Sequence, residues 1–255
     1  MKILCTKMKS IMTACSFGLI AILLASLVVI TNTGSIYFGY AKRIVPIYSV
    51  QTDEKKVALT FDAAWGSDKT EKIVTTLKDA GVLGTFFLVG FWVEQNPEKV
   101  KFIDNAGFDI GTHSNTHPKM STLSESEVYS ELKTSMDLIS NLTGKTVKFF
   151  RPPFGDYNDN LISVAGNLGL KTIQWDVDSL DWKGLSANEI LSRVKNSVKN
   201  GSIILCHNNS DHILEALPLI IDYLKSENYK MVKISELVYE DNYYIDNNGL
   251  QKLNK

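Results

Sequence analysis

Two histidines in one short polar run are the residues of this sequence that most directly suggest chemistry. His113 and His117 stand four positions apart, between Gly111 and Pro118. Imidazoles at this spacing can point the same way on one helical turn, which is a simple way to present two nitrogen ligands to one divalent metal. A polar loop with two solvated histidines also explains the run, so the spacing alone leaves both interpretations open.

Other residues that can act as acids, bases or ligands follow short apolar runs with the composition of buried strands. In a parallel sheet or barrel, the carboxyl ends of the strands meet on one face, which is where such folds form their active sites. Five predicted strands end in this way, with Asp62 after 57–61, His113 after 108–111, Arg151 after 147–150, Asp181 after 172–175 and His207 after 202–205.

The elements that must position these residues alternate along the chain between apolar runs and amphipathic stretches. A further strand is predicted over 85–89. Thr122 and Ser186, each followed three residues later by a glutamate, form capping boxes that begin two helices. Gly144 and Gly201 are predicted to end those helices. This alternation favours βα units around a largely parallel sheet, so the expected fold class is α/β.

Composition limits the classes of function. The chain has 255 residues, 27 basic and 28 acidic side chains, and 44% hydrophobic residues, which suits one globular domain with appendages. The near-zero net charge and the lack of a basic, aromatic-rich cluster argue against nucleic-acid binding. Beyond the N-terminal segment Cys206 is the single cysteine, so the domain must depend on its core rather than on a disulfide.

The N-terminus predicts export and membrane attachment. Residues 1–9 carry three lysines and residues 10–30 are almost wholly apolar, a length that spans a bilayer core as a helix. The positive-inside tendency then leaves 1–9 in the cytoplasm and places the rest outside it, as a single-pass protein of the cell membrane. A cleaved signal peptide is the competing interpretation. Residues 31–50 read as a linker, and 239–255 as a loosely held tail after a domain over 51–238.

Five segments together resemble the motifs of a known family. In order and spacing they are similar to those of the polysaccharide deacetylases of the carbohydrate esterase 4 type, which share the NodB-homology domain. The N-terminus and lead-in further resemble the membrane-anchored branch associated with sporulation and peptidoglycan. The segments are Thr60-Phe61-Asp62, His113-Ser114-Asn115-Thr116-His117-Pro118, Arg151-Pro152-Pro153-Phe154-Gly155, Asp178-Ser179-Leu180-Asp181-Trp182 and Leu205-Cys206-His207.

The resemblance implies a fold, a reaction and a first set of roles. It implies a distorted (β/α) barrel that removes N-acetyl groups from a glycan, here peptidoglycan, with a divalent metal, Zn²⁺ or Co²⁺. By the same resemblance, His113 and His117 are metal ligands and Asp62 is the general base that activates the attacking water. Amide hydrolysis needs such parts, because the metal polarises the carbonyl and lowers the pKa of water.

The remaining matched residues take supporting roles by the same resemblance. Arg151 orients the base, and Asp181 tunes His207, the acid that protonates the leaving amine. Phe154 and Trp182 bind substrate and shape its pocket. Plain structural roles stay open beside these: Asp62 could cap the next helix, Arg151 could serve a structural ion pair, and His207 could be a core histidine. Phe154 and Trp182 could be core residues, and Asp178 is assigned to loop geometry.

One position departs from the family pattern. The first motif of the family normally carries a second aspartate as a metal ligand, but this chain has Ala63 there. Asp62 could turn into the ligand role, Asp68 could reach the site from the next turn as a further ligand, or the site could bind metal poorly. The alternative function is therefore a catalytically weakened glycan-binding protein of the same fold. Trp65 and Trp92 receive no role from the sequence.

Overall fold

The computed structural model describes residues 43–254 of the chain. The predicted cytoplasmic segment 1–9, the predicted membrane anchor 10–30 and most of the predicted linker lie outside the described residues. Within residues 43–254, no helix is both long enough and apolar enough to cross a membrane.

A parallel sheet forms the centre of the molecule, which confirms the predicted α/β class. Its middle strand is β2 (Lys56–Ala63). On one side β2 pairs with β3 (Thr85–Leu88) and β9 (Lys230–Val232), and on the other side it pairs with β8 (Ile203–His207). In spatial order the strands are β6 (Lys171–Thr172), β5 (Phe149–Phe150), β4 (Asp109–Thr112), β3 (Thr85–Leu88), β2 (Lys56–Ala63), β8 (Ile203–His207) and β7 (Val177–Asp178), with β9 (Lys230–Val232) beside the first half of β2.

The two edge strands of this sheet, β6 and β7, are consecutive parts of one stretch of chain. β6 pairs with β5, and only a few residues later β7 pairs with β8 at the opposite edge. The stretch 173–176 crosses between the edges, and Ile173 forms a bridge with Ile47 on the way. The sheet therefore curves into a partial barrel whose edges are joined by the chain. This crossing also explains why the strand predicted over 172–175 ends at Thr172.

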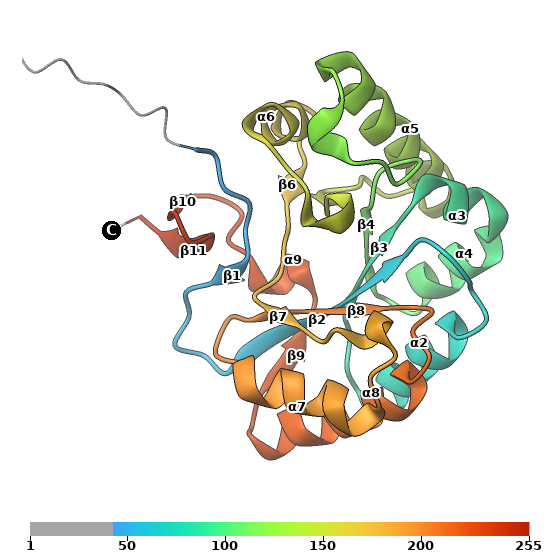
Figure 1. The fold of residues 1–255 in the computed structure, drawn as a ribbon, viewed down its shortest axis with the longest axis vertical. Coiled ribbons are helices and arrows are strands. Elements are labelled where there is room, and N and C mark those ends of the chain that lie inside the picture. Colours follow the sequence, from blue (N-terminus) through green and yellow to red (C-terminus); the bar gives the residue numbers. More distant parts are fainter. Residues whose placement is uncertain (1–42, 255) are drawn as a thin grey trace, which may run out of the picture. The chain divides into compact units, whose positions relative to one another are not determined.

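Helices cover the outer side of the sheet, as Figure 1 shows. Their apolar faces pack against every second residue of the strands to form the larger core cluster. The helices are α2 (Thr70–Asp79), α3 (Gly90–Gln95), α4 (Pro97–Asn105), α5 (Glu125–Thr143), α6 (Asp159–Asn167), α7 (Ala187–Ser197), α8 (Ile213–Ser226) and α9 (Ile234–Leu237), with short 3₁₀ turns at Met120–Thr122, Pro153–Gly155 and Asp181–Lys183.

Two of the four predicted helix ends are confirmed. Ser186 caps α7 with a capping box, and Gly144 ends α5 with a left-handed φ of 68°. The box predicted at Thr122 is wrong: Ser124 caps α5, because Thr122 belongs to the preceding 3₁₀ turn and its hydroxyl donates to the Lys119 carbonyl. The stop predicted at Gly201 is also wrong, since α7 already ends at Ser197.

Strand alternation decides which residues face the inside of the barrel. On β2, Val57, Leu59 and Phe61 belong to the outer core under the helices. The residues between them point the other way, because successive side chains of a strand lie on opposite faces. Asp62 is therefore carried on the inner face. The same period places Phe87 inside, where it joins a smaller core cluster at the base of the barrel.

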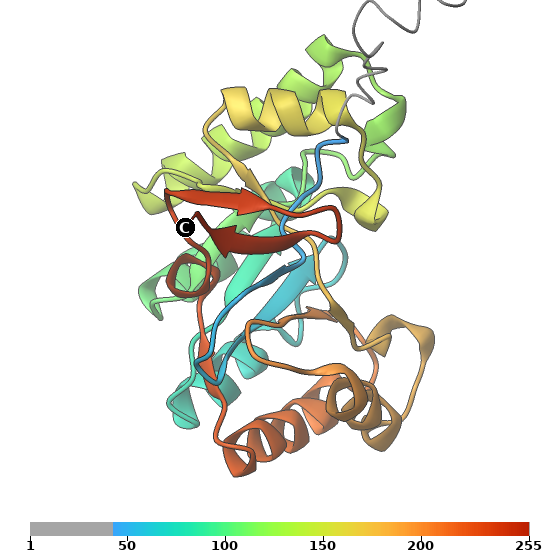
Figure 2. The ribbon, with the colours of Figure 1, turned by 90° about the vertical axis from the view of Figure 1, so that its left-hand side faces the viewer.

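The segments at both ends of the described chain form a second, small sheet. β1 (Ser49–Val50) pairs in parallel with β11 (Leu250–Leu253), which pairs antiparallel with β10 (Tyr243–Ile245). Figure 2 shows the β10–β11 hairpin lying across β1. Gln251 is fully buried there, and its side chain exchanges hydrogen bonds with the backbone of Tyr239. The expectation of a loosely held tail is wrong for 243–253, because these backbone groups pair with β1.

Gly201 offers a test of how tightly β1 is held against the barrel. Its φ of 78° is left-handed, and a Cβ there would lie 1.7 Å from the carbonyl oxygen of Val50. Gly201→Ala should lower the free energy of unfolding by about 1–2 kcal/mol for the backbone strain, plus about 1–3 kcal/mol for the overlap. Urea denaturation measures the change.

Gly81→Ala is the matched control for this substitution. Gly81 has a similar φ of 68° but nothing within 4 Å of the added Cβ, so only the strain of about 1–2 kcal/mol is expected. Equal losses at Gly201 and Gly81 would contradict the close approach of β1.

Candidate active site

The predicted site residues gather at the carboxyl ends of the parallel strands. They surround one cavity of about 540 Å³. Asp68 is exposed and does not line this cavity. Arg151 and Asp181 lie just beneath the lining, with 0% and 1% of their surfaces exposed. The predicted residues that line the cavity are Asp62, His113, His117, Phe154, Trp182 and His207.

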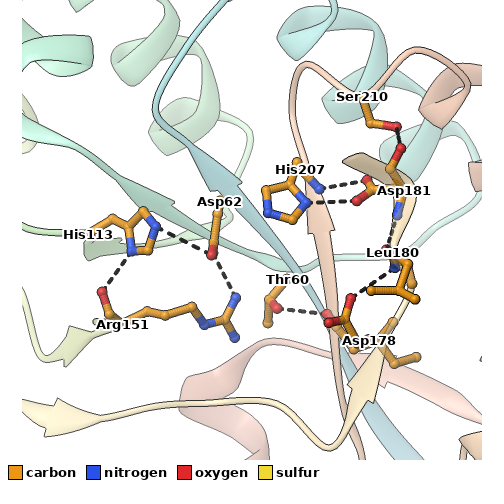
Figure 3. Close-up of polar contacts among 11 residues, drawn as sticks. Thr60, Asp62, His113, Arg151, Asp178, Leu180, Asp181, His207 and Ser210 are labelled. Carbon is orange, nitrogen blue, oxygen red and sulfur yellow. Dashed lines mark hydrogen bonds and ion pairs between the residues drawn. The ribbon is translucent and has the colours of Figure 1, made fainter. Parts of the chain in front are cut away.

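Arg151 connects one half of the site. Its Nη1 donates to Oδ1 of Asp62 at 2.7 Å and its Nη2 donates to the Gln174 carbonyl at 3.2 Å. The guanidinium carbon stands 4.2 Å from the centre of the Phe87 ring, the inward aromatic residue of β3. Figure 3 shows Arg151, Asp62 and His113 forming one connected group. The structural ion pair considered for Arg151 is therefore present, and it is the contact through which the predicted orienting role would act.

The electrostatics of Asp62 favour its ionised form. Burial is the largest single influence and would raise the pKa of Asp62. The charge and hydrogen bond of Arg151, together with the nearby His113 and His207 rings, outweigh burial and hold this pKa below its usual value. The alternative in which Asp62 caps the next helix is wrong, since α2 begins at Thr70 and its N-cap residue is Lys69. Asp62 is thus a charged carboxylate that faces the cavity.

His113 is held in one tautomer. Its Nδ1 lies 2.7 Å from the Arg151 carbonyl oxygen, which can only accept, so Nδ1 carries the proton. Burial lowers the pKa of His113, so the ring is neutral and Nε2 keeps its lone pair. That Nε2 stands 3.5 Å from Oδ2 of Asp62. Nε2 of His113 and Oδ2 of Asp62 are both acceptors, so a cation between them would stabilise this arrangement.

His117 reaches the same place by a different backbone path from the one expected. The residues from His113 to His117 form a loop rather than a helical turn, with left-handed φ values of 69° at Ser114 and 60° at His117. The two imidazole centres are 4.9 Å apart. Burial lowers the pKa of His117 to about 4, and its buried Nδ1 has no hydrogen-bond partner within the described residues. A neutral imidazole of this kind can bind a metal.

His207 and Asp181 form the other half of the site. Nδ1 of His207 lies 2.7 Å from Oδ1 of Asp181, and the His207 backbone N–H donates to Oδ2 at 2.8 Å. Burial works against a charged ring, but the hydrogen bond to Asp181 and its negative charge outweigh burial and raise the pKa of His207. Figure 3 shows the His207 ring turned toward Asp62, with Asp181 behind it. The alternative of an uninvolved core histidine does not fit this arrangement.

Backbone strain is concentrated around the cavity. Left-handed φ is costly for residues with a Cβ, except asparagine and aspartate, and tends to occur at functional sites. In the described part of the chain, two of the residues with such φ values are the asparagines Asn228 and Asn242. The others are Ser114, His117, Phe154 and Leu180, and all of them belong to the loops that carry the site.

The residues present do not make a complete catalytic metal site. Catalytic zinc normally takes three protein ligands. Between residues 43 and 254, no group of three or more histidine, cysteine, aspartate or glutamate side chains is arranged to hold a metal. The two imidazoles supply two nitrogens, Asp62 is already paired with Arg151, and Ala63 supplies nothing. Ala63 is fully buried, and its neighbour Ala64 lines the cavity.

Several residues that line the cavity were not assigned to it from the sequence. Trp65, Trp175, Leu205 and Asn209 all line it, and so does Asp178, which was assigned to loop geometry. The Asp178 carboxylate does accept from the Leu180 N–H at 2.9 Å, so it serves the loop as well. The signal for Trp65 was its place three residues after Asp62, at the end of the same strand.

A carboxylate and an imidazole whose pKa values are shifted in opposite directions face one cavity at the carboxyl ends of a parallel sheet, which is where α/β enzymes place their active sites. The profile of the family described as polysaccharide deacetylase matches residues 49–173. A peptidoglycan-N-acetylglucosamine deacetylase of Bacillus cereus is 33% identical over 204 residues, which cover 78% of this chain and 74% of that protein. The chain therefore belongs to the polysaccharide deacetylase family, as its motifs predicted.

Other relatives differ in length or in activity. YlxY of Bacillus subtilis, an uncharacterized protein, is 33% identical over 195 residues; the match covers 76% of this chain but 61% of YlxY. The crystal structure of BA3943 from Bacillus anthracis, described as a pseudoenzyme of the carbohydrate esterase 4 family, matches with a TM-score of 0.73 and 38% identity over 75% of this chain and 68% of that chain. A BA3943 mutant with the same TM-score and 39% identity, covering 75% and 70%, is described as having restored enzymatic activity.

The charge on His207 depends on Asp181 and can be tested by substitution. Asp181→Asn should lower the pKa of His207, because the hydrogen bond to a carboxylate and its charge are the largest contributions that raise it. Titration of the His207 ring by NMR measures the shift. Asp178→Asn is the graded control, since Asp178 contributes least among the groups that raise this pKa. An unchanged pKa in Asp181→Asn would contradict the pairing.

The same substitution predicts the sign of a stability change. Because folding raises the pKa of His207, its protonated form stabilises the fold at pH values below the unfolded pKa. This contribution disappears as the pH rises through the folded pKa. The difference in unfolding free energy between the native protein and Asp181→Asn should therefore shrink over that pH range.

Proposed function

We propose that the domain acts on an N-acetylated glycan, peptidoglycan, and removes acetyl groups from its amino sugars. The observation that carries this proposal is the pair of opposite charge states across one cavity. Asp62 is held as an anion by Arg151, while Asp181 favours the cation of His207. Titratable groups whose pKa values are moved apart in this way suit the roles of base and acid. The relatives named as peptidoglycan deacetylases support the choice of substrate.

The chemistry assigns one proton transfer to each side. Asp62 accepts a proton from the attacking water, whose oxygen bonds to the amide carbon. His207 donates its proton to the nitrogen as the C–N bond breaks, so that acetate and a free amine result. Arg151 keeps Asp62 ionised and aimed into the cavity. After the products leave, Asp62 gives its proton to solvent and His207 takes one up from solvent, which the hydrogen bond and charge of Asp181 favour. These residues complete the proton path.

The step for which the described part of this chain lacks a residue is polarisation of the carbonyl of the substrate's acetamido group. The family resemblance assigns that task to a divalent metal, for which Zn²⁺ and Co²⁺ are our candidates, but Ala63 replaces a ligand. We therefore expect slow turnover. A second function, binding of acetylated glycan with little or no hydrolysis, is favoured by the missing third ligand. The pseudoenzyme among the similar structures supports the same alternative.

Acetate release separates the two functions. The full-length chain, solubilised in detergent, is incubated with peptidoglycan fragments and Zn²⁺ or Co²⁺, with and without a chelator. Ala63→Asp should increase the metal-dependent release by at least about tenfold, because a third ligand completes the metal site. Ala63→Asn has nearly the same shape but no charge, and is the matched control.

The outcomes show whether the chain is a deacetylase, a glycan-binding protein or neither of the two. Slow release by the native chain that the chelator abolishes identifies a deacetylase. Release by Ala63→Asp alone, with native binding of the fragments, identifies a binding protein. If the native chain and Ala63→Asp both fail to bind the fragments and both fail to release acetate, both functions are contradicted.

We also propose that residues 10–30 anchor the chain in the cell membrane, with residues 1–9 in the cytoplasm and the domain outside it. The lysines before the apolar segment and the membrane-anchored branch that the sequence resembles support this orientation. By the same resemblance we propose a role in sporulation. Protease added to protoplasts should degrade the domain and leave a membrane-bound N-terminal fragment. A domain that is protected until the membrane is broken would contradict the orientation.

A further inference from the structure

The three most exposed aromatic side chains lie together on the surface. Singly exposed apolar residues are ordinary, but a group of them marks a binding surface. Among the exposed large apolar side chains of residues 43–254, Phe154, Trp182 and Trp65 have the highest exposed fractions, 63%, 59% and 57%. All three line the cavity of the candidate active site. Phe154 and Trp182 were assigned to substrate binding by family resemblance, whereas Trp65 has had no role.

Trp65 stands directly beside the residues at the centre of the site. Its ring centre is 4.9 Å from that of His117, in an edge-to-face arrangement. His117 in turn lies 4.6 Å from the ring of Phe154. Behind Trp65, the ring of Phe91 is 6.2 Å away. Trp65 therefore continues an aromatic wall that begins at Phe154, and more than half of its own surface is open.

The turn that carries Trp65 is fixed from beneath. The carbonyl of Gly66 accepts two hydrogen bonds, from Nε1 of Trp92 at 2.7 Å and from Nδ2 of Asn208 at 2.8 Å. Both donor residues are 1% exposed. Gly66 has a left-handed φ of 65°, which a residue with a Cβ would adopt only with strain. The exposed indole is thus presented by a rigid turn, which reduces the entropy lost on binding.

We propose that Trp65 is a sugar-stacking residue that binds a pyranose ring next to the one whose acetamido group enters the cavity. A pyranose presents an apolar face of C–H groups with slight positive charge, which complements the negative face of an indole. The ligand class is an oligosaccharide of N-acetylated amino sugars. Phe154, Trp182 and Trp65 give the cavity three exposed rings, which suits a chain longer than one sugar. The proposal rests on the proposed function, since it places a glycan at that site.

Calorimetric titration with a monosaccharide and an oligosaccharide tests this role. The full-length chain in detergent is titrated with N-acetylglucosamine and with its β-1,4-linked tetramer. Trp65→Ala should weaken tetramer binding by about tenfold, the scale of losing one aromatic contact with its buried area. Binding of the monosaccharide should weaken much less, because a single sugar with its acetamido group at Asp62 and His207 leaves the part of the cavity beside Trp65 to the next ring. Trp65→Phe should keep most of the tetramer affinity.

Two further variants control for structural effects. Tyr129→Ala removes another exposed aromatic residue, 49% exposed on α5 and outside the cavity lining, and should leave both affinities unchanged. Trp92→Phe keeps a buried ring but removes the Nε1 donor to Gly66. It should weaken tetramer binding selectively, because Trp65 loses its fixed position.

The results separate this proposal from the proposed function. Selective loss of tetramer affinity in Trp65→Ala supports the stacking role. If the native chain binds the tetramer and Trp65→Ala binds it equally well, the stacking role is overturned but the proposed function is not. Equal loss for monosaccharide and tetramer also overturns it, because Trp65 would then shape the cavity rather than an adjoining subsite. If the native chain binds neither sugar and does not bind peptidoglycan fragments, both proposals are overturned.

Discussion

The buried ion pair between Arg151 and Asp62 is the contact on which the rest of the site depends. Neither side chain could remain charged in this interior alone, because an unpaired buried ion costs several kcal/mol. Arg151 donates to Asp62 and Gln174, lies over the Phe87 ring, and offers its carbonyl to His113. The guanidinium therefore joins β2, β3 and the segment after β6, and the backbone of the same residue holds His113. Removing the guanidinium would leave the buried carboxylate of Asp62 without its partner.

From this pair follows the division of charge across the cavity. Arg151 stabilises the anion of Asp62, burial keeps His113 and His117 neutral, and Asp181 stabilises the cation of His207. Under the proposed function, Asp62 and His207 are the base and the acid of a deacetylase, although Ala63 stands where the family pattern has a third metal ligand. The open aromatic wall lines the same cavity. The proposed glycan site thus has aromatic side chains and proton-transfer residues but lacks one metal ligand.

Much of this arrangement could be predicted from sequence pattern. The apolar runs that form β2 and β8 placed Asp62 and His207 at strand ends. Parallel strands bring their carboxyl ends together independently of the conformation of the loops. The predictions that failed concern local backbone. The His113–His117 loop does not form a helical turn, because two left-handed residues bend it, and Ser124 rather than Thr122 caps α5. The tail after residue 239 looked polar and loose, yet its backbone completes a sheet with β1. The cap was decided by hydrogen bonds within the same turn, whereas the sheet of the tail depends on β1, from the other end of the described chain, which local propensity does not register.

The sequence by itself determined the class of fold, the family and the residues that gather at the cavity, Asp62, His113, His117 and His207. Residue types and their spacing along strands carry that information. It also determined that the third metal ligand is missing, since alanine has no donor atom. Only the tertiary structure decided which of these groups are charged, because the pKa values depend on burial and on neighbours far away in the chain. It alone made Trp65 part of the site, since exposure and the fixed turn at Gly66 arise from contacts with Trp92 and Asn208, 26 and 142 residues away.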